Sequence, residues 1–152
     1  MMTDAEHHQD KIMAQFDLSR FSSAQSDMFE TALSEIRAGK KRSHWIWFVF
    51  PQIAGLGTSS TANHFAIRTL DEARAFIDDQ LLGGRYLTAV EALQTLPGGS
   101  AERVFGGVDA MKLRSSLTLF EAAGGAAVIG DALEKWFGGE RDARTLALID
   151  AD

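Results

Sequence analysis

The side chains best suited to chemistry gather within residues 41–60 of this 152-residue chain. Lys41 and His44 precede a run of aromatic residues, Gln52 follows it, and a glycine-rich loop then leads into a run of hydroxyl residues. Polar groups beside aromatic walls and a loop of small residues are typical of a ligand pocket. We therefore predict a cleft beside this segment. Its candidate binding residues are Lys41, His44, Trp47, Gln52, Gly57, Ser59 and Ser60.

The glycine loop favours an anionic ligand. Glycines let a backbone approach a ligand closely, and free amides followed by serine hydroxyls at a helix start can hold a phosphate or a carboxylate. The loop is not the phosphate loop that ends in Gly-Lys-Ser/Thr. It also departs from the dinucleotide pattern, because Ser60 stands where that pattern has its third glycine. The alternative is a plain turn with a serine cap for the helix that contains Ala62 and Phe65.

Three titratable residues outside the glycine loop, His44, Arg85 and Asp109, each have two interpretations. His44 is a candidate general base, because the ordinary pKa of histidine lies near neutrality; the alternative is a hydrogen-bonded packing residue beside the tryptophans. Arg85 and Asp109 adjoin glycine-marked breaks, where a charged side chain can turn inward. We expect both to face the cleft together with Lys112. The alternative is a structural salt bridge between Arg85 and Asp109 that fixes two helices.

Composition excludes several classes of function. The chain contains no cysteine, and its four histidines lack the spacing of metal ligands, so we expect no disulfide, metal or cofactor. A net charge of −6 disfavours nucleic acid as a partner. No apolar run approaches the ~18 residues needed to cross a bilayer, so we expect no membrane partner. The first thirty residues lack a secretory signal, which predicts a cytoplasmic location.

Capping patterns and apolar spacing predict helices along most of the chain. Ser22 with Gln25 predicts the start of a first helix that closes at Gly39, and Thr69 with Glu72 predicts a later start. Ser100, Asp109 and Asp142 are expected at or near the starts of others. Beyond the first helix and the one with Ala62, the predicted helices are 71–78, 82–96, 100–105, 109–120, 128–137 and 142–149.

The run from Trp45 to Phe50 is the difficult segment. Its aromatic and β-branched residues favour a strand on propensity alone. Nothing else in the chain alternates with period two, however, and an unpaired strand would leave buried backbone groups unsatisfied. We therefore expect a buried helix. The predicted fold is all-α: residues 17–152 form a single compact orthogonal bundle of about seven to nine short helices around this aromatic helix, after a disordered or frayed segment at 1–16.

The pattern around this run resembles the bacterial family called domain of unknown function 1810. The similarity extends over about residues 20–148 and implies an all-α domain, but no activity or site residue is established for that family. Some relatives carry a calpastatin-like label, and nothing in this chain suggests protease inhibition. Tyr86 stands where the family usually has Leu, and 126–129 lacks the family's usual aromatic residue. The central motif comprises Lys41, His44, Trp45, Trp47, Phe48, Phe50, Pro51, Gln52, Gly55, Leu56 and Gly57; further agreement includes Arg20, Arg85, Asp109, Lys112, Ser115 and Asp142.

Two functions follow from these patterns. The leading hypothesis is a domain that binds, or acts on, a small polar or anionic ligand between residues 44–60 and the trio Arg85, Asp109 and Lys112. The alternative is a non-enzymatic protein–protein interaction domain in which the aromatic run is only core and an apolar surface patch engages the partner. The first predicts a polar cleft and the second predicts none.

Overall fold

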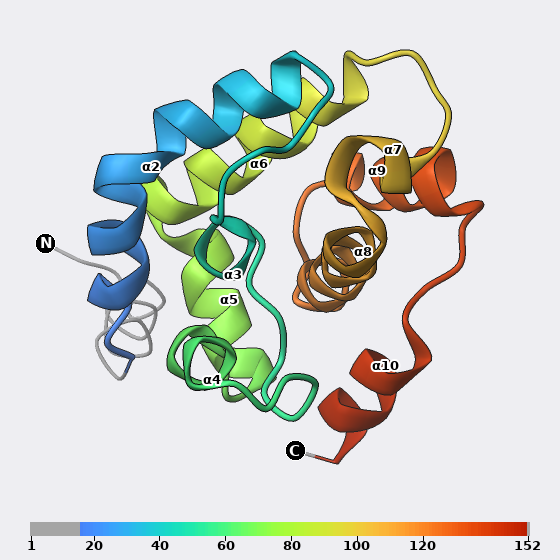
Figure 1. The fold of residues 1–152 in the computed structure, drawn as a ribbon. Coiled ribbons are helices and arrows are strands. Elements are labelled where there is room, and N and C mark those ends of the chain that lie inside the picture. Colours follow the sequence, from blue (N-terminus) through green and yellow to red (C-terminus); the bar gives the residue numbers. More distant parts are fainter. Residues whose placement is uncertain (1–15, 152) are drawn as a thin grey trace, which may run out of the picture.

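A computed structural model describes residues 16–151 of the protein, and all regular secondary structure in that range is helical apart from one isolated bridge. In Figure 1, α2 and α6 run side by side, α8 is seen almost end-on, and α10 stands at the margin after an extended linker. The predicted all-α bundle is confirmed. The helices are α2 (Ser19–Arg37), α3 (Ile46–Val49), α4 (Ser60–Phe65), α5 (Leu70–Asp78), α6 (Gln80–Gln94), α7 (Ala101–Phe105), α8 (Gly107–Ala122), α9 (Ala127–Phe137) and α10 (Ala143–Asp150).

A continuous cluster of buried apolar side chains fills the space between these helices. Aromatic rings form its centre: the ring centroids of Phe50 and Tyr86 are 5.4 Å apart, and those of Tyr86 and Phe120 are 4.6 Å apart. Tilted or edge-on ring pairs at these separations add to the stabilisation from burial. The Tyr86 hydroxyl is satisfied by Ser116 Oγ at 3.0 Å. Burial raises the pKa of Tyr86 far above its ordinary value, so this hydroxyl is a fixed polar contact within the core.

The aromatic run is helical and buried as predicted, but only for the single turn of α3. The helix is one residue shorter at each end than the predicted Trp45–Phe50. Pro51 disfavours helical backbone at the residue before it, and Phe50 accordingly has φ −125° and ψ 72°. Beyond the proline the chain is extended, and Ile53 forms a parallel bridge with Ile67. The turn therefore lies inside the bundle, and the segment after it returns to the surface.

The first helix ends near Gly39 as predicted, but its predicted start was wrong. Helix α2 begins at Ser19, where the Asp17 carboxylate accepts hydrogen bonds from the Ser19 amide and hydroxyl. Gln25 is not a capping residue. Its side chain is buried and donates to the Phe48 carbonyl at 2.7 Å, so it joins α2 to α3.

Side-chain caps fix several of the remaining helix starts. Thr69 Oγ1 accepts from the Glu72 amide at 3.1 Å, as predicted, and the Asp142 side chain caps α10. Asp79 ends α5 and caps α6, so the two helices follow each other directly. Ser100 precedes α7 without a side-chain cap bond, contrary to expectation.

Close packing at the turn between α5 and α6 depends on Gly83. A Cβ atom on Gly83 would lie 2.0 Å from the Ile77 carbonyl oxygen, so the two helices approach more closely there than any side chain permits. Gly84 is its neighbour in α6, and a Cβ there would meet nothing within 4 Å. The first glycine is therefore needed for helix packing, whereas the second is not.

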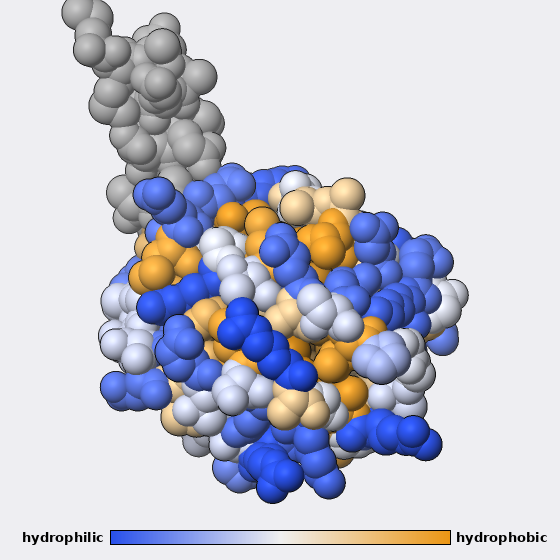
Figure 2. Space-filling model, turned by 90° about the horizontal axis from the view of Figure 1, so that it is seen from above, coloured by the Kyte–Doolittle hydropathy of each residue, from blue (hydrophilic) through white to orange (hydrophobic). Residues whose placement is uncertain are grey.

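The surface shows small apolar groups separated by polar side chains on the face in Figure 2. Within residues 16–151, no helix is long and apolar enough to cross a membrane. The predicted frayed segment at 1–16 falls outside the described residues except for Phe16, and His7 and His8 belong to that part.

Candidate functional site

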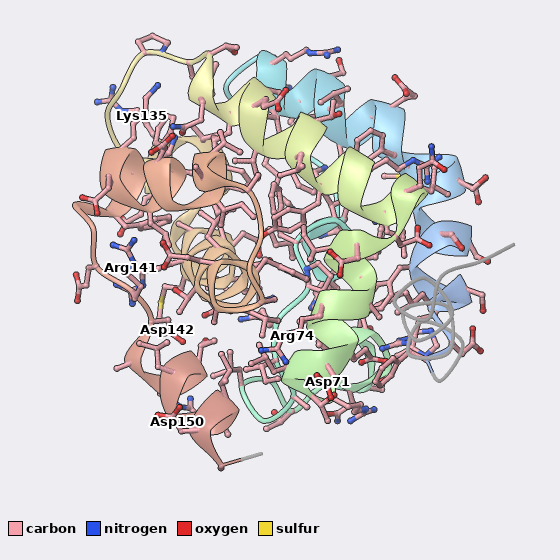
Figure 3. All side chains as sticks on the ribbon, turned by 180° about the vertical axis from the view of Figure 1, so that it is seen from behind. Asp71, Arg74, Lys135, Arg141, Asp142 and Asp150 are labelled. Carbon is pink, nitrogen blue, oxygen red and sulfur yellow. The ribbon has the colours of Figure 1, made fainter. Side chains whose placement is uncertain are left out.

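A cleft of about 390 Å³ opens between the loop before α4, the first half of α8 and the start of α10. These segments are far apart in sequence. They meet because Leu148 of α10 lies against Gly55 and the Arg144 guanidinium donates to the Gly55 carbonyl at 3.4 Å. Figure 3 shows Asp142 where the linker after α9 reaches α10, beside α8. The lining residues are Trp47, Gln52, Leu56, Gly57, Thr58, Ser59, Ala62, Val108, Met111, Lys112, Ser115, Asp142 and Arg144.

Lys112 and Trp47 form one wall of the cleft. The Lys112 Nζ lies 4.6 Å from the centroid of the half-buried Trp47 ring, where the ring's electron-rich face attracts the ammonium group. The nearest carboxylate is Asp109, whose Oδ1 is 3.7 Å from Lys112 Nζ, too far for a hydrogen bond. The ammonium group is thus held in place while its hydrogen-bond donors remain available.

Asp109 is instead paired with Lys41. Lys41 Nζ lies 2.7 Å from Asp109 Oδ2, donates to the Ser43 carbonyl and lies 4.9 Å from the Trp45 ring centroid. Only 6% of the Lys41 side chain is exposed. This buried lysine is the close partner of Asp109, and Lys112 keeps only a long ion pair with the same carboxylate. Neither Lys41 nor Asp109 lines the cleft.

Asp142 belongs to the cleft wall but is already occupied by hydrogen bonds. Its Oδ2 accepts from the Thr145 amide at 3.0 Å and from the Thr145 hydroxyl at 2.5 Å, and it lies 3.3 Å from Ser115 Oγ. The buried Ser115 hydroxyl also donates to the Met111 carbonyl. These bonds join α8 to α10 and hold the carboxylate in the cap, so Asp142 is a structural member of the wall.

The loop before α4 forms the opposite wall. Gly57 is needed there because a Cβ would lie 2.6 Å from that of Ala62, which brings the loop against α4. Ser59 Oγ accepts from the Ala62 amide, so the predicted plain turn with a serine cap is confirmed. Gln52 is a half-buried residue of the cleft lining, and its side-chain amide can both donate and accept hydrogen bonds. Gln52 also lines a hollow of about 10 Å³ behind the cleft, about the size of one water molecule.

The structure brings together five of the ten residues predicted to bind ligand: Trp47, Gln52, Gly57, Ser59 and Lys112. His44 and Ser60 are exposed and lie outside the cleft. The exposure of His44 contradicts the packing role considered for it beside the tryptophans.

Arg85 lies elsewhere in the molecule. It donates to Gln25 Oε1 at 3.4 Å and lies over the Phe29 ring. The predicted salt bridge between Arg85 and Asp109 was wrong, because Lys41 reaches Asp109 from the loop after α2.

Apart from Lys112, sequence reasoning missed the contributions of α8 and α10 to the cleft. Val108 and Met111 expose 69% and 63% of their surface, three residues apart on the outer face of α8. Two large apolar residues on a solvent-facing side are a usable signal, because such residues normally face the core. Arg144 offered no comparable signal, since it reaches the cleft only through the packing of α10.

No group of three or more His, Asp or Glu side chains able to hold a metal ion occurs within residues 16–151. His44 and His64 both lie outside the cleft, so its lining supplies no imidazole as a general base. What the lining supplies is cations, unpaired hydrogen-bond donors and apolar surface, a combination suited to binding.

Comparisons with known proteins give a family and a solved structure. Residues 15–149 match the family model described as "Protein of unknown function (DUF1810)". The crystal structure of the conserved hypothetical protein Rv1873 from Mycobacterium tuberculosis superposes with a TM-score of 0.87 at 42% sequence identity, covering 90% of this chain and 98% of that one. No curated protein matches the chain.

Proposed function

The chain belongs to the DUF1810 family of proteins of unknown function, and from the geometry of its cleft we propose that it binds a small anionic ligand. The proposal depends on one observation, the position and the ion-pair partner of the Lys112 ammonium group. Its ammonium group lies in the cleft wall over Trp47, while the nearest carboxylate is hydrogen-bonded to Lys41. A lysine held in this way is a preformed partner for a phosphate or carboxylate oxygen.

The charges around the cleft support this choice of ligand. Lys112 and Arg144 bring two positive charges to the lining, and Asp142 brings one negative charge that is engaged in the α10 cap. The overall charge of the protein is −6, so a positive cleft stands out from its surroundings. The Gln52 amide adds further hydrogen-bonding capacity on the opposite wall.

The apolar part of the cleft limits the shape of the ligand. Lys112 already covers one face of the Trp47 ring, so a planar group of the ligand does not stack on that face. Leu56, Val108 and Met111 provide the apolar surface instead. The expected ligand therefore has one anionic end and one small apolar portion.

A thermal-shift screen against nucleotides, sugar phosphates and small carboxylates tests the proposal. A ligand at ~100 times its Kd stabilises the folded state by ~2.7 kcal/mol, a readily measured rise in Tm. Hits are then measured with Lys112→Gln and Arg144→Gln, and with Lys40→Gln as a control because Lys40 is exposed outside the cleft. The first two variants should lose the shift and the control should keep it. No hit across the three classes, or hits that survive both cleft variants, would overturn the proposal.

The protein–protein alternative is favoured by one observation, the exposure of Val108 and Met111 at the cleft rim. Such residues can insert into a partner as readily as they can cover a small ligand. The two proposals differ at Met111→Glu. A partner surface centred there would be disrupted by the new charge, whereas a ligand whose anionic end contacts Lys112 would lose only part of its apolar contact.

A further inference from the structure

Arg114 is the least satisfied arginine with a partly buried side chain within residues 16–151. Its Nε is buried without a hydrogen-bond partner. Its NH1 lies 3.6 Å from Glu140 Oε2 and its NH2 lies 3.9 Å from Asp142 Oδ1, so both contacts are longer than hydrogen bonds. Buried donors are almost always satisfied in folded proteins, and an exception requires an explanation.

Arg114 lines a second groove, of about 330 Å³, on the opposite side of Met111 from the cleft. Its walls come from α7, α8 and α9 and include Trp136 and Phe137. Trp136 is fixed, because its Nε1 donates to Gln94 Oε1 at 2.9 Å and Lys135 lies over its ring. The groove thus has a rigid aromatic and apolar wall and one guanidinium group, that of Arg114. The Arg114 side chain is 25% exposed.

Two other arginines show which hydrogen bonds a guanidinium group with a structural role makes in this protein. Arg141 donates to both Glu121 oxygens at 2.6 and 2.9 Å and also to Glu134, and Arg20 donates to the carbonyls of Asp17, His64 and Ala66. Arg114 has no equivalent set of acceptors. Asp142 is engaged by Thr145 and Ser115, and the Glu140 side chain is 75% exposed and therefore well screened by water.

We infer that this groove binds a hydrophobic monocarboxylate, whose carboxylate oxygens accept hydrogen bonds from Arg114 and whose apolar body lies on Trp136 and Phe137. A carboxylate matches the planar fork of a guanidinium group. Arg114 is the one basic residue of the groove lining, and Glu102 is its one acidic residue. A phosphate dianion would therefore bring one negative charge more than a monocarboxylate into a lining with a single cation.

Amide chemical-shift titration with phenylacetate tests the inference, with phenylacetamide and inorganic phosphate as matched probes. Phenylacetate should cause saturable shifts in the Trp136 indole resonance and in the α8 and α9 amides, and the neutral amide and phosphate should not. Arg114→Gln should weaken binding by about tenfold or more, the loss expected for a charge-assisted hydrogen bond. Lys40→Gln should leave it unchanged, because Lys40 is exposed and lies outside both the cleft and the groove.

Three outcomes would overturn the inference. The first is the absence of saturable shifts up to about 10 mM phenylacetate. The second is equal binding of phenylacetate and phenylacetamide by the unaltered protein, a comparison that needs no variant to fold. The third is a set of shifts confined to the lining of the first cleft, with none at the Trp136 indole, which would assign the acid to the cleft of the proposed function. Failure of that proposed function would leave all three measurements interpretable, since none depends on a ligand in the first cleft.

Discussion

Two tryptophans of the aromatic run, two residues apart, are in opposite environments. Trp45 is fully buried, and its Nε1 donates to Glu35 Oε1 at 3.0 Å. Trp47 is half-buried, lines the cleft and carries Lys112 over its ring. One short turn therefore supplies both a core anchor and a cleft wall. Side chains on the core side are fully satisfied, whereas those on the cleft side keep unused donors.

The difference extends to the charged residues on either side of the turn. On the core side, Glu35 accepts hydrogen bonds from the Arg42 and Ser43 amides, the Ser43 hydroxyl and the Trp45 indole. On the cleft side, Lys112 makes one long ion pair and a contact with a ring. Residues on the core side are therefore expected to determine stability and those on the cleft side the proposed ligand binding, so substitutions can test the two separately.

The largest expected effect is on the core side, at Trp45. Trp45→Ala should lower the free energy of unfolding by about 3–5 kcal/mol, because it leaves a cavity among rings that include Phe50 and Phe105. Trp47→Ala is the matched control. Its ring is only half-buried, so the loss should be about 1–2 kcal/mol. Urea denaturation measures both, and equal losses would contradict the division between the two tryptophans.

A smaller, pH-dependent effect is expected at Glu35. Partial burial alone would raise its pKa, but hydrogen bonds from Ser43, Arg42 and Trp45 outweigh burial and lower the pKa from 4.5 to about 2. A lowered pKa in the folded state means that Glu35 stabilises the fold fully above pH 4.5 and loses this contribution as the pH falls towards 2.

Glu35→Gln should therefore reduce the free energy of unfolding by about 1–2 kcal/mol at pH 7, and by progressively less between pH 4.5 and 2. Glu30→Gln is the control, because Glu30 is exposed on the same helix and its loss should change stability by less than ~0.5 kcal/mol. Denaturation curves across this pH range test the expectation. A difference between Glu35→Gln and the unaltered protein that stays constant down to pH 2 would be inconsistent with the hydrogen-bonded carboxylate.

Local patterns in the sequence were enough to predict the fold class and most helix ends, because caps such as Thr69 and breaks such as Gly39 act within a few residues. They failed where the decisive contact is distant. Gln25 resembles a capping residue, yet its partner is the Phe48 carbonyl, 23 positions away. For the same reason Arg85 was paired with the wrong acid.

Half of the predicted binding residues line the cleft, because a single loop and turn carry most of them. The rest of the lining includes neighbours in the same loop and in α4, the outer face of α8, and Asp142 and Arg144. Arg144 joins the site only when α10 folds back against Gly55, about 90 positions earlier in the chain. No apolar periodicity or capping pattern within α10 indicates that contact, so it could not be predicted from the sequence.

The smallest expected effect on stability is that of replacing Lys112. Lys41 is the matched comparison, because both lysines lie near the Asp109 carboxylate. Lys41→Gln removes the buried partner of Asp109 and should destabilise the protein by about 3 kcal/mol, since the partly buried carboxylate keeps only the more distant Lys112. Lys112→Gln removes only a 3.7 Å ion pair and a contact with a half-buried ring, so the change should stay within ~0.5 kcal/mol. Paired urea denaturation of the two variants tests this. If Lys112→Gln destabilised as much as Lys41→Gln, Lys112 would be part of the scaffold, and its ammonium group would no longer be available to an anion.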